Sequence, residues 1–364
     1  MKPYRVVLAV AIVLATAVAW LPRATGSRTA DVRPLPERFT DAEYWQLSHE
    51  LSEPNGSFRS DNLLSNEIWF QHVIPDLTAL TNPGGAYLGV GPEQNFTYIA
   101  ALKPKIAFIV DIRRGNLHLH LMYKALFEQS TDRAEFVSRL FSRTRPDGLD
   151  ETVTATQLFN AYSQTTSNTE LYASNLASIR RHLTGTRRLP LTNDDLAGIE
   201  YVYRSFHWYG PAIQYRSSAG RGWRAHATYS DLMTATDADG QSRSYLASEE
   251  AFRVVKDLHS RNMLVPVVGN FGGPKALRAV GQYLAGHGLI VSGFYLSTVE
   301  QYLRQDRLWR DFCGNAASLP LDGTSQFIRS VRNGPYGFGT SLNSELATMT
   351  AETKHCSNRL IPYP

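Results

Sequence analysis

The chain has 364 residues, of which 43% are hydrophobic and 19% are charged, and its formal net charge is +4. This length suits one large domain with an appendage, and the hydrophobic fraction is sufficient for a core. The basic residues are scattered and do not follow one element, which argues against a nucleic-acid-binding protein. The two cysteines, Cys313 and Cys356, form no Cys-x-x-Cys motif, which excludes zinc-ribbon and thioredoxin-like sites. They can pair with each other or remain reduced, and both interpretations stay open.

Residues 1–21 combine Lys2 and Arg5 with an uncharged apolar run over residues 6–21. That run is longer than the core of most signal peptides, about 7–15 residues, and shorter than most spanning helices, about 17–25 residues. A signal peptide and an uncleaved membrane anchor both fit, and a buried helix is the remaining alternative. We expect an exported or membrane-anchored protein. A cytosolic-facing anchor stays open, because basic residues flank both ends of the run.

A polar, proline-containing stretch at residues 22–40 is typical of a linker, and a domain over residues 41–364 follows it. The apolar spacing predicts an initial series of helices and strands: helices at 41–51 and 62–80, a strand at 86–90, a helix at 94–101, a buried strand at 106–112 and a helix at 117–129. Thr40 and Asp61 are candidate N-caps of the first two helices. Residues 130–222 interrupt this alternation and are predicted to form a mainly helical insertion, with its best helix at 196–209.

The alternation resumes after the insertion. The predicted elements are a strand at 224–229, a helix at 248–261, a strand at 263–268, a helix at 274–285, a strand at 289–295 and a short helix at 298–303. Residues beyond Trp309 show little periodicity. Strands that alternate with helices indicate an α/β domain with a doubly wound, mostly parallel sheet.

Two short motifs suggest a ligand site at the first two strands. Gly89, Gly91 and Glu93 lie where the first strand leads into a helix, where glycines allow a tight turn and the close approach of a ligand. Asp111 and Ile112 end the next strand, about twenty residues further on. A carboxylate at that place can accept the hydroxyl groups of a ribose. The alternative is a plain tight turn followed by a solvated aspartate.

Residues 87–93, Tyr-Leu-Gly-Val-Gly-Pro-Glu, resemble the first motif of the class I S-adenosylmethionine-dependent methyltransferases. The resemblance implies a methyltransferase-like Rossmann fold, with S-adenosylmethionine as cofactor and a small molecule as acceptor. It assigns Asp111 to the acid after the second strand, Asp231 to the third-strand acid near the adenine, and Asn270 with Phe271 to the motif after the fourth strand. Tyr229, Asp231 and Asn270 are then the catalytic candidates, and Gly89, Gly91, Glu93, Asp111 and Ile112 are the cofactor-binding candidates.

The sequence departs from that family at positions that limit which class of ligand can bind. Gln94 or Asn95 replaces the third glycine of the motif, and Pro92 has no N–H to donate. A dinucleotide is therefore disfavoured, because its pyrophosphate needs a glycine-rich helix start. The chain has no Asn/Asp-Pro-Pro-aromatic motif, which removes support for methylation of nucleic-acid bases. It also resembles a poorly characterised bacterial group that has segments like residues 58–62 and 294–303.

Other chemistry has little support. His118 and His120 are two residues apart in a predicted helix and point in different directions, so we expect no metal site and at most a supporting role near Asp111. The motifs of serine hydrolases, P-loop proteins and zincins are absent. Two functions remain: a transferase that uses S-adenosylmethionine, and a non-catalytic exported or anchored protein that binds another ligand or a partner. The spacing of Gly89, Gly91 and Asp111 favours the transferase, and the apolar N-terminus favours the alternative.

Overall fold

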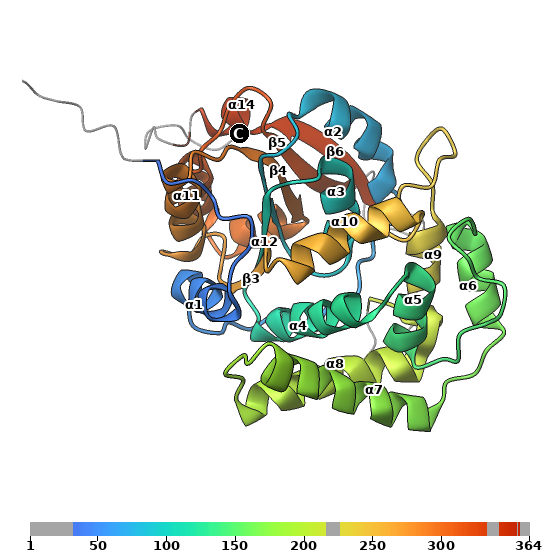
Figure 1. Ribbon diagram of the computed structural model, residues 1–364. Coiled ribbons are helices and arrows are strands. Elements are labelled where there is room, and N and C mark those ends of the chain that lie inside the picture. The colour runs from blue at the N-terminus through green and yellow to red at the C-terminus, as the bar shows by residue number, and fades with distance from the viewer. Residues whose placement is uncertain (1–31, 216–225, 333–341, 355, 357–364) are drawn as a thin grey trace, which may run out of the picture. The chain divides into compact units, whose positions relative to one another are not determined.

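The computed structural model describes residues 32–215, 226–332, 342–354 and 356. These residues form an α/β fold with a mixed, mostly parallel six-stranded sheet of order β3-β2-β1-β4-β5-β6 (Figure 1). The apolar segment predicted at residues 1–21 lies outside the described residues. Among the described helices, none is both long enough and apolar enough to cross a membrane.

All strands run parallel except the last, β6, which pairs antiparallel with β5. The strands are β1 (Ala86–Gly89), β2 (Ile106–Asp111), β3 (Leu264–Val268), β4 (Val291–Ser297), β5 (Gln326–Arg332) and β6 (Leu342–Thr348). Strands β1, β2 and β3 are buried along their whole length, as continuous apolar runs in a parallel sheet require. The chain runs outward from β1 to β2 and β3 and then returns to β4 on the other side of β1. This reversal lies between β1 and β4, and such switch points are where open α/β sheets bind ligands.

Helices cover the sheet in two groups. The first group packs together through α10: α3 (Gln94–Leu102), α4 (Arg114–Gln129) and α10 (Glu249–Ser260). The second group packs through α11: α1 (Asp41–Leu51), α11 (Ala276–Gly286) and α13 (Trp309–Ala317), with α12 (Val299–Gln305) against α13. The remaining short elements are η1 (Phe70–Val73), α2 (Ile74–Leu80), α9 (Tyr229–Thr234) and α14 (Met349–Thr353). Connections between parallel strands of one sheet are almost always right-handed, a rule that predicts the two groups on opposite faces of the sheet.

The predicted insertion is mainly helical in its described part, with loops between the helices. Its elements are α5 (Arg133–Phe141), α6 (Ala155–Ser163), α7 (Thr169–Arg181), the π-helical turn η2 (His182–Thr186), α8 (Asn193–Tyr209) and η3 (Gly210–Ala212). Figure 1 shows α7 and α8 next to α4, which they contact. Arg133 anchors the insertion, because its buried guanidinium pairs with Glu249 at 3.0 Å and donates to backbone carbonyls on both sides.

Most predicted elements are confirmed to within a few residues, and three are wrong. Residues 62–69 form no helix: Asn62 has a φ of +43°, and Asp61 accepts from Tyr201 at 2.6 Å and caps no helix. No strand occupies the described part of 224–229, because Thr228 caps the short helix α9. The aperiodic tail contains α13, β5, β6 and α14. The third strand of the sheet is therefore β3, and the fourth is β4.

The described part of the predicted linker follows the domain surface. Arg33 donates to the Gly286 carbonyl at 3.0 Å, and Phe39 is buried and donates to the Arg261 carbonyl. Thr40 is the N-cap of α1, as predicted, and forms a reciprocal capping box with Glu43.

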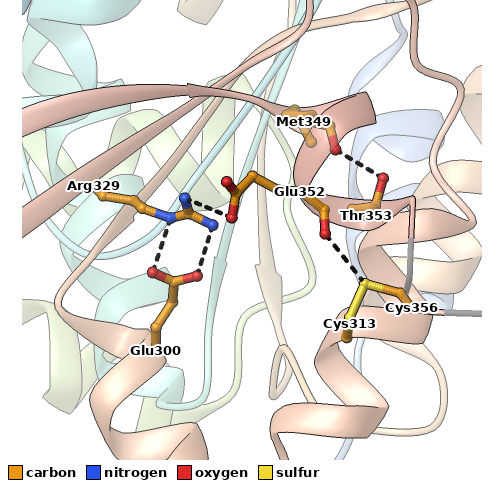
Figure 2. The surroundings of a disulfide bond; sticks show 7 residues. All are labelled: Glu300, Cys313, Arg329, Met349, Glu352, Thr353 and Cys356. Atoms are coloured by element: carbon orange, nitrogen blue, oxygen red, sulfur yellow. Dashed lines mark hydrogen bonds and ion pairs between the residues drawn. A yellow bond between two sulfur atoms is a disulfide. The ribbon is translucent and has the colours of Figure 1, made fainter. Parts of the chain in front are cut away.

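The two cysteines form a disulfide bond between α13 and the turn after α14, with a Cα–Cα distance of 5.2 Å between Cys313 and Cys356 (Figure 2). Figure 2 also shows that Glu352 of α14 lies against Arg329 of β5, at 3.2 Å. Arg329 in turn pairs with Glu300 on α12 at 2.9 Å. The disulfide therefore holds an element that reaches α12 through two ion pairs.

Candidate functional site

A cavity of about 1200 Å³ opens at the carboxyl ends of the central strands. Its floor is formed by residues at the ends of β1, β2 and β3, and residues at the end of β4 contribute to the opposite side. One wall is a segment that we call the cap loop, residues 57–67, and another comes from the end of α8 and the residues around η3. The lining includes Gly91, Pro92, Asp111, Ile112, Arg113, Asn270, Ser297, Tyr302, Trp208, Tyr209 and Tyr215. The cavity lies at the switch point of the sheet, between β1 and β4.

The turn after β1 depends on glycine at Gly91, where φ is +75° and nothing lies within 4 Å of the place that a Cβ atom would take. This left-handed conformation is strained for other residues, and the open space beside it faces the cavity. Asn95 fixes the turn, because its Nδ2 donates to the carbonyls of Val90 and Pro92 at 2.9 and 2.7 Å. Asn95 is one of the two residues that can stand in place of the motif's third glycine, and it orders the turn.

Gly89 has a different reason to be glycine. A Cβ at this position would lie 1.8 Å from Asn95 Oδ1, which also accepts from the Tyr87 hydroxyl at 2.9 Å. Gly89 therefore makes room for Asn95, and it is not among the described residues that line the cavity. Glu93 also lies away from the lining: it is fully buried and accepts from the Ser65 N–H at 3.2 Å. Burial raises the pKa of Glu93 to about 8.

His120 supports the same turn from behind. Its Nε2 lies 2.9 Å from the Gly91 carbonyl, and burial lowers the pKa of the imidazole to about 4. The ring is therefore neutral near pH 7, so Nε2–H donates to the carbonyl. His118, two residues earlier on α4, points elsewhere and lies 2.8 Å from Asp195 of α8. Within the described residues, no group of three or more His, Cys, Asp or Glu side chains is arranged to hold a metal ion.

Asp111 lines the cavity at the end of β2 and is 5% exposed. Its carboxylate is held by Arg113: Nε lies 2.9 Å from Oδ1, and Nη2 lies 2.8 Å from Oδ2. The Arg113 backbone N–H also donates to Oδ1, at 2.9 Å. Each carboxylate oxygen can accept about two hydrogen bonds, so the acceptor position left over is on Oδ2. Ile112 lines the cavity beside it, and its carbonyl accepts from Gly56 at 2.8 Å.

Arg113 also holds the cap loop over the cavity. Its Nη1 donates to the carbonyls of Ser60, at 3.0 Å, and Asp61, and its guanidinium lies over the Phe58 ring. On the other side, Arg59 Nη2 donates to the Tyr302 hydroxyl at 2.8 Å. The two segments that resemble the uncharacterised bacterial group, residues 58–62 and 294–303, therefore meet at this cavity.

Asn270 follows β3, the strand next to β2, and lines the cavity. Its Oδ1 accepts from the Gly272 N–H at 2.9 Å, and its own N–H donates to Glu53 at 3.1 Å. Because the third strand is β3, Asn270 occupies the third-strand position and not the fourth-strand position that the sequence suggested. The ends of three neighbouring strands thus present Gly91, Asp111 and Asn270 to one cavity.

The other two catalytic candidates lie away from the described lining of this cavity. Tyr229 is fully buried among aromatic residues, and its hydroxyl contacts that of Tyr245. Asp231 is the third residue of α9 and accepts from the Thr228 N–H and hydroxyl, both at 2.8 Å. Both candidates depend on a strand predicted at 224–229; residues 226–229, the described part of that range, form no strand, and Asp231 lies on α9 instead.

Sequence reasoning missed a buried carboxylate in the cavity. Glu67 is 1% exposed, and its Oε2 accepts from Gln94 Nε2 at 2.9 Å. Its Oε1 accepts from the Ser297 hydroxyl at 2.5 Å. This contact joins residues 230 positions apart, which no local pattern around Glu67 indicates. The only signal in the sequence is the polar cluster at residues 60–67, which is equally typical of a helix cap.

A family model described as a domain of unknown function, DUF7790, matches residues 63–194 and 213–361. The match covers more than half of the chain, so this protein belongs to that family. A search of the curated proteins finds no match. The matched ranges include the β1 turn, Asp111, Asn270, Glu67 and Ser297.

Proposed function

We propose that the protein is an S-adenosylmethionine-dependent transferase of the methyltransferase type, with a methyltransferase-like Rossmann fold. One observation carries the proposal: Gly91, Asp111 and Asn270 follow three adjacent strands and line one cavity at the switch point. In the family that the sequence resembles, the same three positions face the amino-acid part, the ribose and the adenine of the donor, in that order. A spatial row in the same order supports a nucleoside-type ligand.

The residues fit such a ligand with one restriction. The open space at Gly91 admits close approach to the backbone, as an amino-acid group requires. Asp111 is committed to Arg113 through three hydrogen bonds, so it has a single acceptor position left for a ribose hydroxyl. S-adenosylmethionine, when bound, supplies an electrophilic methyl group. The contribution of the chain is to hold donor and acceptor in line and to exclude water, and proximity supplies much of the rate in such reactions.

Calorimetric titration of the purified full-length protein with S-adenosylhomocysteine tests the proposal. We expect saturable binding, and no heat at millimolar ligand would contradict it. Asp111→Asn should weaken binding about tenfold, because a hydrogen bond to a charged acceptor is lost. Asp231→Asn is the matched control: it removes a carboxylate that lies outside the cavity lining, and affinity should not change. Equal losses in both variants would indicate general destabilisation.

The disulfide favours a second function. Disulfide bonds persist mainly in oxidising compartments, and the cytosol is not one of them. An exported or membrane-anchored protein would have no access to cytosolic S-adenosylmethionine, and it would then use the cavity to bind another ligand without catalysis. A reporter fused after residue 40 distinguishes the two functions. A periplasmic or extracellular signal supports the second function, and a cytosolic signal supports the transferase.

A further inference from the structure

Glu67 is a buried acid that forms no ion pair within the described part of the chain. Three neutral side chains donate hydrogen bonds to it: Gln94 to one carboxylate oxygen, Ser297 to the other, and the Tyr295 hydroxyl to the same carboxylate. A carboxylate has about four acceptor positions, so about one stays open for a substrate. A buried carboxylate is costly unless it is paired with a cation or fully hydrogen-bonded. Its place in the cavity lining therefore requires a reason beyond stability.

The backbone that presents Ser297 to Glu67 is itself unusual. Ser297 has a φ of +51°, a left-handed conformation that costs free energy for a residue other than glycine. It ends β4, where the pairing with β5 shifts register between Tyr295 and Ser297. Strained residues of this kind collect at functional sites, and an observed outlier is a reason to look for function. Here the strained residue donates its hydroxyl to the carboxylate in the cavity.

The position of this pair relative to the row of Gly91, Asp111 and Asn270 is also informative. That row lies at the ends of β1, β2 and β3, whereas Ser297 ends β4, on the other side of the switch point. In a donor that lies along this row with its adenine at β3, the methyl-bearing sulfur lies between the ribose at β2 and the amino-acid part at β1, and β1 is the neighbour of β4. The remaining lining beyond β4 is the wall formed by Tyr302 and the cap loop, which leaves room for an acceptor.

We propose that Glu67 is the proton acceptor for the acceptor substrate and that Ser297 positions its carboxylate, an inference that rests on the transferase function proposed above. The acceptor is then a small molecule with a hydroxyl or amine nucleophile, because the carboxylate accepts a proton from O–H or N–H. The oxygen or nitrogen lone pair forms the bond to the methyl carbon. The carbon–sulfur bond breaks with its electron pair moving to sulfur, and the proton of the nucleophile goes to Glu67.

Sinefungin tests this assignment without knowledge of the acceptor. It is an S-adenosylmethionine analogue with an amine at the place of the transferred methyl group, so its ammonium should contact the Glu67 carboxylate. We expect the full-length protein to bind sinefungin at least about tenfold more tightly than S-adenosylhomocysteine, which lacks that group. In Glu67→Gln this preference should fall to near one, while S-adenosylhomocysteine binds as before.

Glu170→Gln is the control, since it removes a negative charge from an exposed position on α7, outside the described cavity lining, and should leave the preference intact. Ser297→Ala should reduce the preference for sinefungin in part. This variant provides a second measurement if Glu67→Gln does not fold. The assignment is overturned if the unaltered protein does not prefer sinefungin, or if both Glu67→Gln and Ser297→Ala keep the preference. In either case, binding of S-adenosylhomocysteine still supports the proposed function. Failure of the unaltered protein to bind either ligand overturns both.

Discussion

The two sides of the cavity are built in different ways. The floor at β1 and β2 comes from one continuous segment, in which the Gly91 turn and Asp111 end neighbouring parallel strands. The opposite side joins the cap loop, the end of α8 and the end of β4, and its contacts connect distant residues: Arg59 bonds Tyr302 across 243 positions, and Glu67 bonds Ser297 across 230. Local sequence pattern can therefore indicate the first side but not the second.

Arg113 is the residue that connects the two sides. It belongs to the floor through Asp111, and it holds the cap loop through the carbonyls of Ser60 and Asp61. If the floor and the opposite side are separate structural units joined by Arg113, substitution of Arg113 should destabilise the cavity most. Substitutions on one side should leave the structure of the other side unchanged.

The first prediction is that Arg113→Ala costs roughly 3–5 kcal/mol of unfolding free energy, because it leaves Asp111 buried without its partner. The two side chains are 10% and 6% exposed, so solvent cannot replace the lost pair. Urea unfolding measures the effect. Arg253→Ala is the control: it breaks an ion pair whose side chains are 64% and 71% exposed, and its midpoint should not change measurably. If the midpoint of Arg113→Ala is also unchanged, the Asp111–Arg113 pair contributes nothing measurable to stability.

The second prediction concerns the side that includes α12. Reduction of Cys313–Cys356 should cost about 2–4 kcal/mol, because the bond restricts the unfolded chain. Loss of the bond should also release α14, whose Glu352 reaches Glu300 through Arg329. Hydrogen exchange should therefore increase in residues 299–305 and stay constant in residues 86–111. The double variant Cys313→Ser/Cys356→Ser should no longer respond to the reductant. Uniform acceleration across both segments would contradict the division into two sides.

The third prediction concerns Glu93, which lies beneath the floor. Its pKa is about 8 in the folded protein and 4.5 in the reference state, so between these values the folded state holds the extra proton. Stability should therefore fall as pH rises through this window, with a slope of at most about 1.4 kcal/mol per pH unit. His120 contributes the opposite slope between about 4 and 6.5, because its folded pKa is lowered.

Comparison of variants isolates the contribution of Glu93. Glu93→Gln removes the titrating group and keeps its shape, so urea midpoints at about pH 5 and about pH 8 should differ less than in the unaltered protein. Glu170→Gln, at an exposed position on α7, should keep the original pH dependence. If Glu93→Gln keeps it as well, Glu93 is charged in the folded protein and its burial has been compensated.

Sequence predicts the elements that have a local pattern and misses those that depend on contacts between distant residues. The helix at 41–51 and the strands at 86–90 and 106–112 are predicted to within one residue, because each has a continuous local pattern. The helix expected at 62–80 begins only at Phe70, since Asn62 has a left-handed φ and Glu67 bonds Ser297, which is distant in the sequence. The strands β5 and β6 have little apolar alternation, and the pairing between them stabilises them.

A single misplaced strand accounts for the shifted assignments of Asp231 and Asn270. A strand at 224–229 would make Met263–Val268 the fourth strand, which moves the third-strand position to Asp231. With β3 as the third strand, the same position falls on Asn270, which lines the cavity. Gly91 and Asp111, chosen from local pattern, line the cavity, whereas Gly89 and Glu93 of the same motif lie outside its described lining. The assignments of Asp231 and Asn270 depend on counting strands, and one false strand shifts both.

The fourth prediction tests the floor alone and has the smallest effect on stability. Gly91→Ala should cost about 1–2 kcal/mol, the strain of a left-handed φ of +75°. Its methyl group would enter the space that faces the cavity, so affinity for S-adenosylhomocysteine should fall at least about tenfold. Gly148→Ala is a matched control: φ is +76°, nothing lies within 4 Å, and the position is in the insertion. It should incur the same strain and leave affinity unchanged. Because the two substitutions differ only in location, a loss confined to Gly91→Ala must arise from steric conflict with the ligand. Equal affinity in both variants would mean that the ligand does not approach the β1 turn.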